Sequence, residues 1–157
     1  MKHDLEFLID QVEQILKDNI NVKLNAIDIE KADGISLKKI DECAYFKQEL
    51  DSRTVNFNPF VLMFIKDIQG EGLGPATLQL VTLTVLICLT DQNPEDSIYR
   101  QVVRYHRALK EVFEDHFTEI ESASRITVTT LRPDYLQLLN SARMHRAVGV
   151  DITMGIG

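Results

Sequence analysis

The chain has 157 residues, of which 45% are hydrophobic and 26% are charged, a composition within the range of one globular domain that buries its own core. The formal net charge of -7 argues against an evenly basic nucleic-acid-binding protein and leaves room for a local basic patch. No apolar run is long enough to span a membrane, and the N-terminal residues lack the apolar core of a secretory signal. We therefore expect no membrane association. The cysteines, Cys43 and Cys88, are expected to be reduced thiols in a cytosolic setting rather than a disulfide, because Cys88 falls in a strongly apolar segment.

The first segment predicts an amphipathic helix over residues 5–18. Its apolar residues recur at helical spacing: Leu5, Leu8, Ile9, Val12, Ile15 and Leu16. Asn19 and Asn21 are expected to interrupt the helix. Residues 22–31 then predict a second short helix, although the same residues also alternate as in a strand.

A turn at Asp33 and Gly34 precedes a long stretch, residues 35–58, that fits no single period. We interpret it as an ordered arm held to the domain by Ile40, Tyr45 and Phe46. Short extended pieces are expected at residues 35–40 and 54–57.

Two apolar segments, residues 60–68 and 78–90, predict a β-hairpin with a long tip at residues 69–77. In the second strand one face is wholly apolar and the other is mixed with threonine, so we expect one face in the core and the other partly covered or against another subunit. The tip is rich in glycine, and its candidate contact residues are Gly70, Glu71, Gly72, Leu73 and Gly74. It either reaches a partner or is a loose surface hairpin.

The next segment predicts a long helix that is capped by Asn93, begins at Pro94 and extends to Phe117. Asn93 can cap the helix, and proline is favoured at the first helical position, where a missing N–H has no cost. The apolar residues form one stripe that should pack on the sheet: Ile98, Val102, Tyr105, Leu109, Val112, Phe113 and Phe117.

Further strands are predicted over residues 125–131 and 147–156, with a short helical turn or an irregular loop at residues 135–143 between them. The predicted order is therefore α-β-β-α-β-β within one domain over residues 1–157. We expect an α+β fold in which two main helices pack on one face of a four-stranded mixed or antiparallel sheet, with the arm of residues 35–58 in addition.

No catalytic residue, cofactor or metal site is predicted. The histidines His106 and His116 share an element but do not have the spacing of metal ligands, and the common metal, nucleophile and nucleotide motifs are absent from the sequence. The glycine-rich tip resembles a phosphate-binding loop only loosely, because a proline follows it where a helix carrying lysine is needed.

The long helix carries a basic ridge, Arg100, Arg104 and Arg107, on one face of an acidic protein. One interpretation is a solvated face with a few ion pairs. The alternative is a subunit interface with the acidic surface of a neighbouring copy, for which these three arginines are the candidates.

Several pieces of the chain, taken in order, resemble the tail terminator or neck proteins of long-tailed bacteriophages. These pieces are the N-terminal helix, the KADG turn, the NPFVLMFIKD strand, the VTLTVLICLTDQNPEDSIYRQVVRYHRALKEVF strand and helix, and the closing HRAVGVDITMGI strand. The resemblance covers most of the chain. It rests on architecture and local texture, and it includes no catalytic fingerprint.

The resemblance implies a structural virion protein that is not an enzyme and binds neither a cofactor nor a small-molecule substrate. Such proteins assemble in the host bacterial cytoplasm as a homo-oligomeric ring, typically a hexamer, at the neck of the virion. The ring caps the tail tube, joins it to the head-tail connector proteins, and lets DNA pass through its lumen without specific binding. In this setting the tip residues are expected to make ring-to-ring contacts.

Two alternatives remain open at this point. The first is an adjacent head-tail joining or tail completion protein of the same assembly. The second is a cellular α+β binding module, or a small enzyme whose site is formed by scattered residues.

Overall fold

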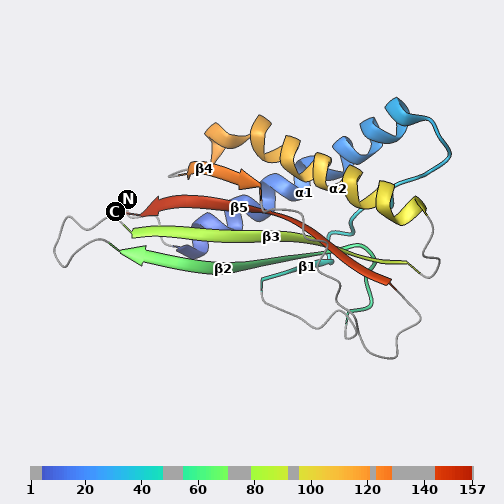
Figure 1. The fold of residues 1–157 in the computed structure, drawn as a ribbon. Coiled ribbons are helices and arrows are strands. Elements are labelled where there is room, and N and C mark those ends of the chain that lie inside the picture. Colours follow the sequence, from blue (N-terminus) through green and yellow to red (C-terminus); the bar gives the residue numbers. More distant parts are fainter. Residues whose placement is uncertain are drawn as a thin grey trace.

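The computed structural model describes residues 5–47, 55–70, 79–91, 96–120, 123–128 and 144–156 (Figure 1). The helices are α1 (Leu5–Lys31) and α2 (Asp96–Asp115), and a short 3-10 helix follows at Phe117–Glu119. The strands are β1 (Tyr45–Phe46), β2 (Phe60–Gly70), β3 (Gln79–Asp91), β4 (Ala123–Val128) and β5 (Met144–Ile156). The expected α+β class and the order of the main elements are confirmed.

The strands form one five-stranded sheet with the order β1-β2-β3-β5-β4. The four predicted strands pair with one another only in antiparallel fashion. The two-residue β1 pairs in parallel with β2, so the sheet is mixed. This strand lies inside the predicted arm, and its pairing partner is distant in the sequence, which is why periodicity did not reveal it.

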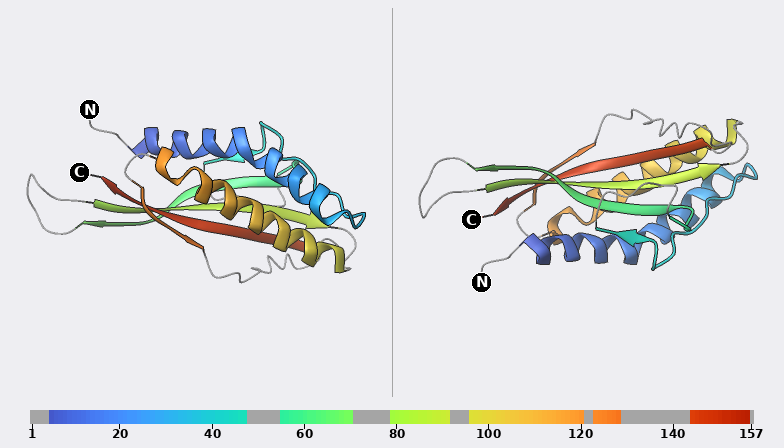
Figure 2. Two further views of the ribbon diagram at one scale, coloured as in Figure 1. Left: turned by 90° about the horizontal axis from the view of Figure 1, so that it is seen from above. Right: turned by 90° about the horizontal axis from the view of Figure 1, so that it is seen from below.

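Both helices lie side by side on the same face of the sheet, as predicted (Figure 2). The core lies between the two layers. On β3 the alternating residues Leu83, Val85 and Ile87 are fully buried, and β5 places Ile152, Val150 and Val148 directly opposite them. The helices contribute Leu16, Ile20, Leu109, Val112 and Phe113 to the same core.

The expected break in the N-terminal helix was wrong, because α1 is one continuous helix of 27 residues. Asparagine is a poor former of helix interiors because its amide competes for backbone groups. Here Asn19 donates to the Ile15 carbonyl at 2.8 Å, within the same helix. Asn21 exchanges two hydrogen bonds with the backbone of Ile40 and so attaches the arm to the helix. Both amides therefore stabilise the arrangement that the sequence pattern seemed to oppose.

The arm is fixed to the domain through residues 35–47. Leu37, Ile40 and Ala44 are buried, and the Val61 amide donates to the Ala44 carbonyl at 2.8 Å. The extended pieces expected at residues 35–40 and 54–57 are not paired into the sheet over their described residues. Phe46 adds a contact on the far face of the sheet, where its ring packs near those of Phe57 and Phe60. Residues 48–54 lie outside the described part of the chain.

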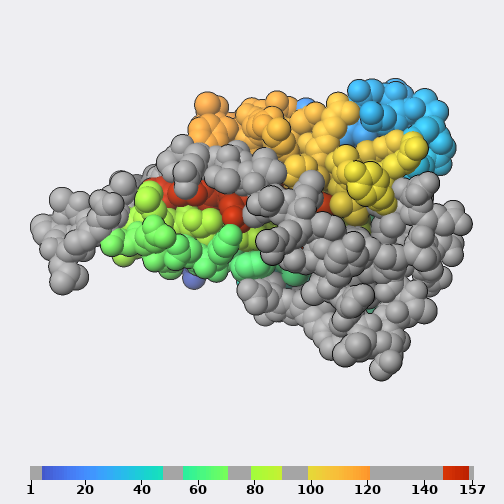
Figure 3. All heavy atoms as spheres, viewed as in Figure 1, coloured from blue at the N-terminus to red at the C-terminus, as the bar shows by residue number. Residues whose placement is uncertain are grey.

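The β2–β3 hairpin extends beyond the helical layer, and the end of β5 accompanies it (Figures 1 and 3). On β2, Ile65 and Ile68 are exposed, whereas the residues opposite them on β3, Leu83 and Val81, are buried. Gly70 is the last residue of β2, opposite Gln79, and belongs to the strand rather than to the predicted tip. Glu71, Gly72, Leu73 and Gly74 lie outside the described residues, as do Asn93, Pro94 and residues 135–143.

Candidate functional site

The basic ridge of α2 faces the end of α1 and the turn that follows it. Arg104 is only 6% exposed, and its guanidinium holds both carboxylate oxygens of Asp33, with 3.0 Å between Nη1 and Oδ1. Arg100 approaches the same carboxylate at 3.6 Å. The hydrogen bonds from Arg104 hold the pKa of Asp33 well below its usual range. Arg104 thus makes its ion pair within the chain.

The turn itself is shaped to present Asp33 to α2. Gly34 has a φ of 82°, a conformation that glycine adopts without steric cost. The Ile35 amide donates to the Asp33 carboxylate at 3.3 Å, and the Leu37 amide donates to the Asp28 carboxylate at 3.1 Å. On the α2 side, the Tyr105 hydroxyl donates to the Lys38 carbonyl at 2.6 Å. The KADG segment therefore joins both helices to the arm.

Arg107 continues the contact one turn further along α2. Its guanidinium pairs with Glu111 on the same helix at 2.8 Å and with Glu30 of α1 at 2.6 Å. These two carboxylates raise the pKa of Arg107. The side chains of Arg100 and Arg107 are nevertheless 58% and 39% exposed. The predicted ion pairs exist within the chain, and the role of the ridge as a subunit interface stays a prediction.

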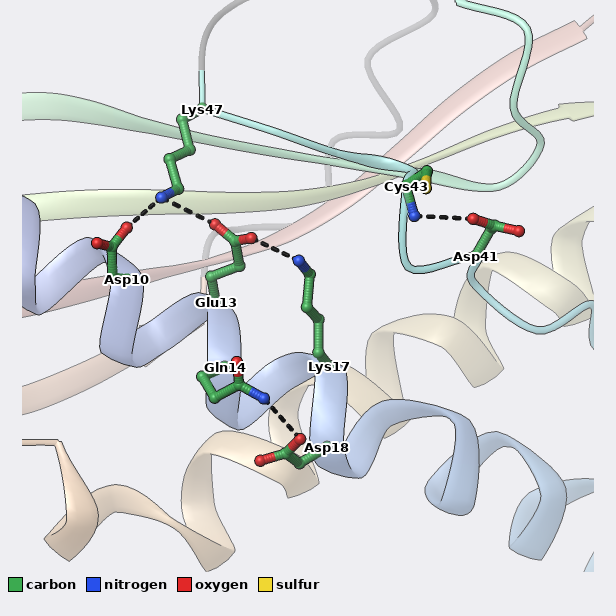
Figure 4. A network of polar contacts seen from close by, with 8 residues as sticks. All are labelled: Asp10, Glu13, Gln14, Lys17, Asp18, Asp41, Cys43 and Lys47. Atoms are coloured by element: carbon green, nitrogen blue, oxygen red, sulfur yellow. Dashed lines mark hydrogen bonds and ion pairs between the residues drawn. The ribbon is translucent and has the colours of Figure 1, made fainter.

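A second polar network ties the arm to the first half of α1 (Figure 4). Lys47, which follows β1, pairs with Asp10 and with Glu13, the latter at 3.1 Å. Glu13 also pairs with Lys17 at 2.7 Å. Burial acts to raise the pKa of Glu13, but the hydrogen bonds and charges of the two lysines outweigh it and the pKa is lowered. The Lys17 ammonium lies 5.1 Å from the centre of the Tyr45 ring, which adds a cation–π contact to β1.

Beside α1 lies an open groove of about 550 Å³, lined by Phe7, Asp10, Gln11, Gln14, Ile15, Asp18 and Glu119. Gln11 closes one side of it by donating to the Glu119 carbonyl at 2.9 Å. Gln14 donates to the Asp18 carboxylate at 2.8 Å along the rim. The groove combines apolar walls with carboxylates, and the sequence pattern did not reveal it because Glu119 is remote from α1 in the chain.

Asp151 of β5 is a buried carboxylate on the sheet face away from the helices, and it is 8% exposed. It accepts a hydrogen bond of 2.7 Å from the Thr84 hydroxyl and lies 3.1 Å from the Lys66 ammonium. Lys66 reaches Asp151 because the β2 register shifts between Ile65 and Asp67. The sequence signal for this cluster was the single aspartate in an otherwise apolar strand. Its partners could not be predicted, because they depend on the strand register.

In these clusters the charged side chains form ion pairs and hydrogen bonds with one another. Within the described ranges, no three His, Cys, Asp or Glu side chains gather closely enough to hold a metal ion. Cys43 and Cys88 are free thiols, and burial raises the pKa of Cys88 to about 12. Among the helices described, none combines the length and apolar composition needed to cross a membrane.

No protein-family model matches the chain, and a search of curated proteins finds no significant match.

Proposed function

We propose that this chain is a structural virion subunit of the tail terminator type. In this proposal it assembles in the host bacterial cytoplasm as a hexameric ring at the virion neck. The ring caps the tail tube and joins it to the head-tail connector proteins.

The observation that carries the proposal is the projection of the β2–β3 hairpin beyond the helical layer. The hairpin leaves the domain at the end where only strands extend, and Ile68, two residues before the end of β2, is 52% exposed. Exposed apolar residues at the end of a protruding element are suited to contact with another protein. In a stack of rings, such a projection provides reach from one ring to the next.

The charge of the chain supports a role around passing DNA. A net charge of -7 disfavours retention of phosphate groups, since non-specific DNA binding depends on lysine and arginine neutralising the backbone. The most prominent cluster of arginines is also partly neutralised within the subunit, by Asp33 and Glu30. A lumen built from such subunits would let DNA pass without specific binding.

The test is direct observation of assembly. The purified chain, alone and mixed with tail tubes, is examined by light scattering and negative-stain electron microscopy. The expected results are a mass near six times 17.9 kDa and rings at tube ends. A chain that stays monomeric at high concentration and does not bind tubes would reject the proposal.

A paired variant tests the hairpin specifically. Ile68→Lys should leave ring formation intact and reduce joining to tubes or connectors, because it places a charge on the exposed end of the hairpin. Lys39→Glu on the arm is the matched control, an exposed charge change far from the hairpin in sequence. Equal joining by both variants would contradict a role for the hairpin.

A further inference from the structure

The outer surface of α2 presents an unusual exposed aromatic side chain near its start. Tyr99 is 72% exposed, and Val103, one turn later on the same side, is 42% exposed. The exposed guanidinium of Arg100 lies beside them. Tyrosine and arginine are the residue types enriched at the energetic centres of protein interfaces. We refer to Tyr99, Arg100 and Val103 as the α2 stripe.

The groove beside α1 has the complementary character. Phe7, 44% exposed, and Ile15 supply apolar walls, while Asp18 and Glu119 supply negative charge at the rim. The groove is open to solvent and has a volume of about 550 Å³. An aromatic ring can pack on the apolar walls while a neighbouring guanidinium pairs with the carboxylates at the rim.

The stripe and the groove lie at opposite ends of the helical layer. The two helices are antiparallel, since Lys23 pairs with Asp115 while Glu30 pairs with Arg107. Tyr99 is in the first turn of α2, whereas Glu119 follows its last turn, so about 24 Å of helix lies between Tyr99 and the end of α2 at 1.5 Å per residue. Figure 2 shows the start of α2 beside the end of α1, whereas the groove is lined by the first half of α1. The two surfaces cannot meet within one chain.

The charges also remain suited to contact outside the chain. Arg100 approaches Asp33 only at 3.6 Å, and that carboxylate is already held by Arg104. At the groove, the Glu119 side chain is 58% exposed and contacts His116, while Asp18 is exposed and accepts from Gln14. Opposite charges across an interface select the partner and fix its orientation.

We propose that the α2 stripe of one copy docks into the α1 groove of the next copy, and that this head-to-tail contact is the subunit interface. The proposal rests on the ring put forward above and names the surfaces that close it. Because the two surfaces differ, the contact is heterologous, as a cyclic assembly larger than a dimer requires. The bound partner is a second copy of this chain.

The first test is a charge swap in the full chain, with association measured by sedimentation velocity. Arg100→Glu alone and Asp18→Lys alone should each weaken association by about tenfold or more, because each places like charges across the contact. The double variant restores opposite charges and should associate like the wild type. The control is Lys39→Glu on the arm. It makes the same change in charge as Arg100→Glu and should have no effect on association.

The second test is cross-linking in a Cys43→Ser background, which removes the exposed native thiol. Chains carrying Tyr99→Cys are mixed with chains carrying Gln14→Cys and treated with a flexible bismaleimide. A cross-linked dimer should form in the mixture and not from either variant alone. Equal cross-linking of Tyr99→Cys chains with each other would indicate a two-fold contact and overturn the inference.

The outcomes separate the two proposals. If the wild type forms rings and the single charge variants assemble equally well, the groove contact is overturned and the proposed function stands. If the wild type forms no ring, alone or with tail tubes, the proposed function fails and the groove contact fails with it.

Discussion

The Thr84 hydroxyl of β3 donates a 2.7 Å hydrogen bond to the Asp151 carboxylate of β5 on the sheet face that the helices do not cover. The two residues are direct partners in the β3–β5 register. A slip of one residue would turn Asp151 toward the apolar core, because side chains alternate between faces along a strand. This pair therefore specifies the alignment of the two central strands.

Removing the Thr84 hydroxyl should measurably destabilise the fold. Thr84→Val leaves the buried Asp151 with one hydrogen-bonding partner fewer, which we expect to cost about 1–3 kcal/mol in the free energy of unfolding. Urea denaturation followed by circular dichroism measures the change. Thr82→Val, on the same strand face, is the control and should cost much less; equal losses would mean that the pair is not special.

Gly149 should tolerate no larger residue. A Cβ added there would lie 2.3 Å from Leu86 Cδ2 and 2.7 Å from the Val85 carbonyl oxygen. Because the backbone oxygen of a central strand cannot move aside cheaply, Gly149→Ala should cost about 1–3 kcal/mol through overpacking. At Gly70 the nearest atom to an added Cβ is 3.8 Å away, so Gly70→Ala should leave the denaturation midpoint nearly unchanged.

The arginines of α2 should differ in what their loss affects. Arg104→Gln removes the side chain that holds both oxygens of Asp33, so the midpoint of thermal unfolding should fall clearly. Arg100→Gln removes an exposed side chain with one long contact and should leave that midpoint almost unaltered. A destabilised Arg100 variant, or an unaffected Arg104 variant, would contradict this division between a folding role and an exposed one.

Stability should fall as the solution becomes acidic. The pKa of Glu13 is lowered from 4.5, and those of Asp33 and Asp115 are lowered from 3.8, so each ionised form is favoured in the folded state. Such groups contribute stability above their unfolded pKa, and this contribution is lost as pH falls through the lower folded value. Burial also lowers the pKa of His106 from 6.5, so melting temperatures should begin to decline below about pH 6.5 and fall more steeply below about pH 4.5, where these carboxylates protonate.

Glu13→Gln tests how much the Glu13 carboxyl of α1 contributes to the loss of stability in acid. The variant should be less stable near neutral pH, and its melting temperature should fall less steeply on acidification, because the titrating carboxyl is gone. Glu6→Gln, an exposed change on the same helix, should retain the wild-type profile. A Glu13 variant with the full wild-type slope would show that other carboxyls dominate.

The elements predicted correctly are those whose burial has a regular period. Alternation in β3 identified the core face through Leu83, Val85 and Ile87, and the helical stripe of α2 placed Leu109 and Phe113 in the core. The continuity of α1 could not be predicted, because the bonds of Asn21 to Ile40 depend on where the arm returns. Propensity is a local quantity, and here a contact made by a distant segment outweighs it.

The candidate surfaces were harder to predict for the same reason. The ridge of Arg100, Arg104 and Arg107 is visible as a helical stripe, but its partners Asp33 and Glu30 belong to another element. The groove depends on Glu119 approaching α1 after α2 has packed. Periodicity places side chains on a face of one element, whereas a site requires the relative positions of several.

The strand order has a consequence for the timing of folding. β4 is synthesised before β5, yet within the described sheet it pairs only with β5, which also supplies the second partner of β3. During synthesis, the backbone groups of β3 that pair with β5, and those of β4, therefore remain unpaired until β5 has been made. Until then that edge is open to pairing with other chains. The nascent protein is thus most prone to aggregation just before its last strand is in place.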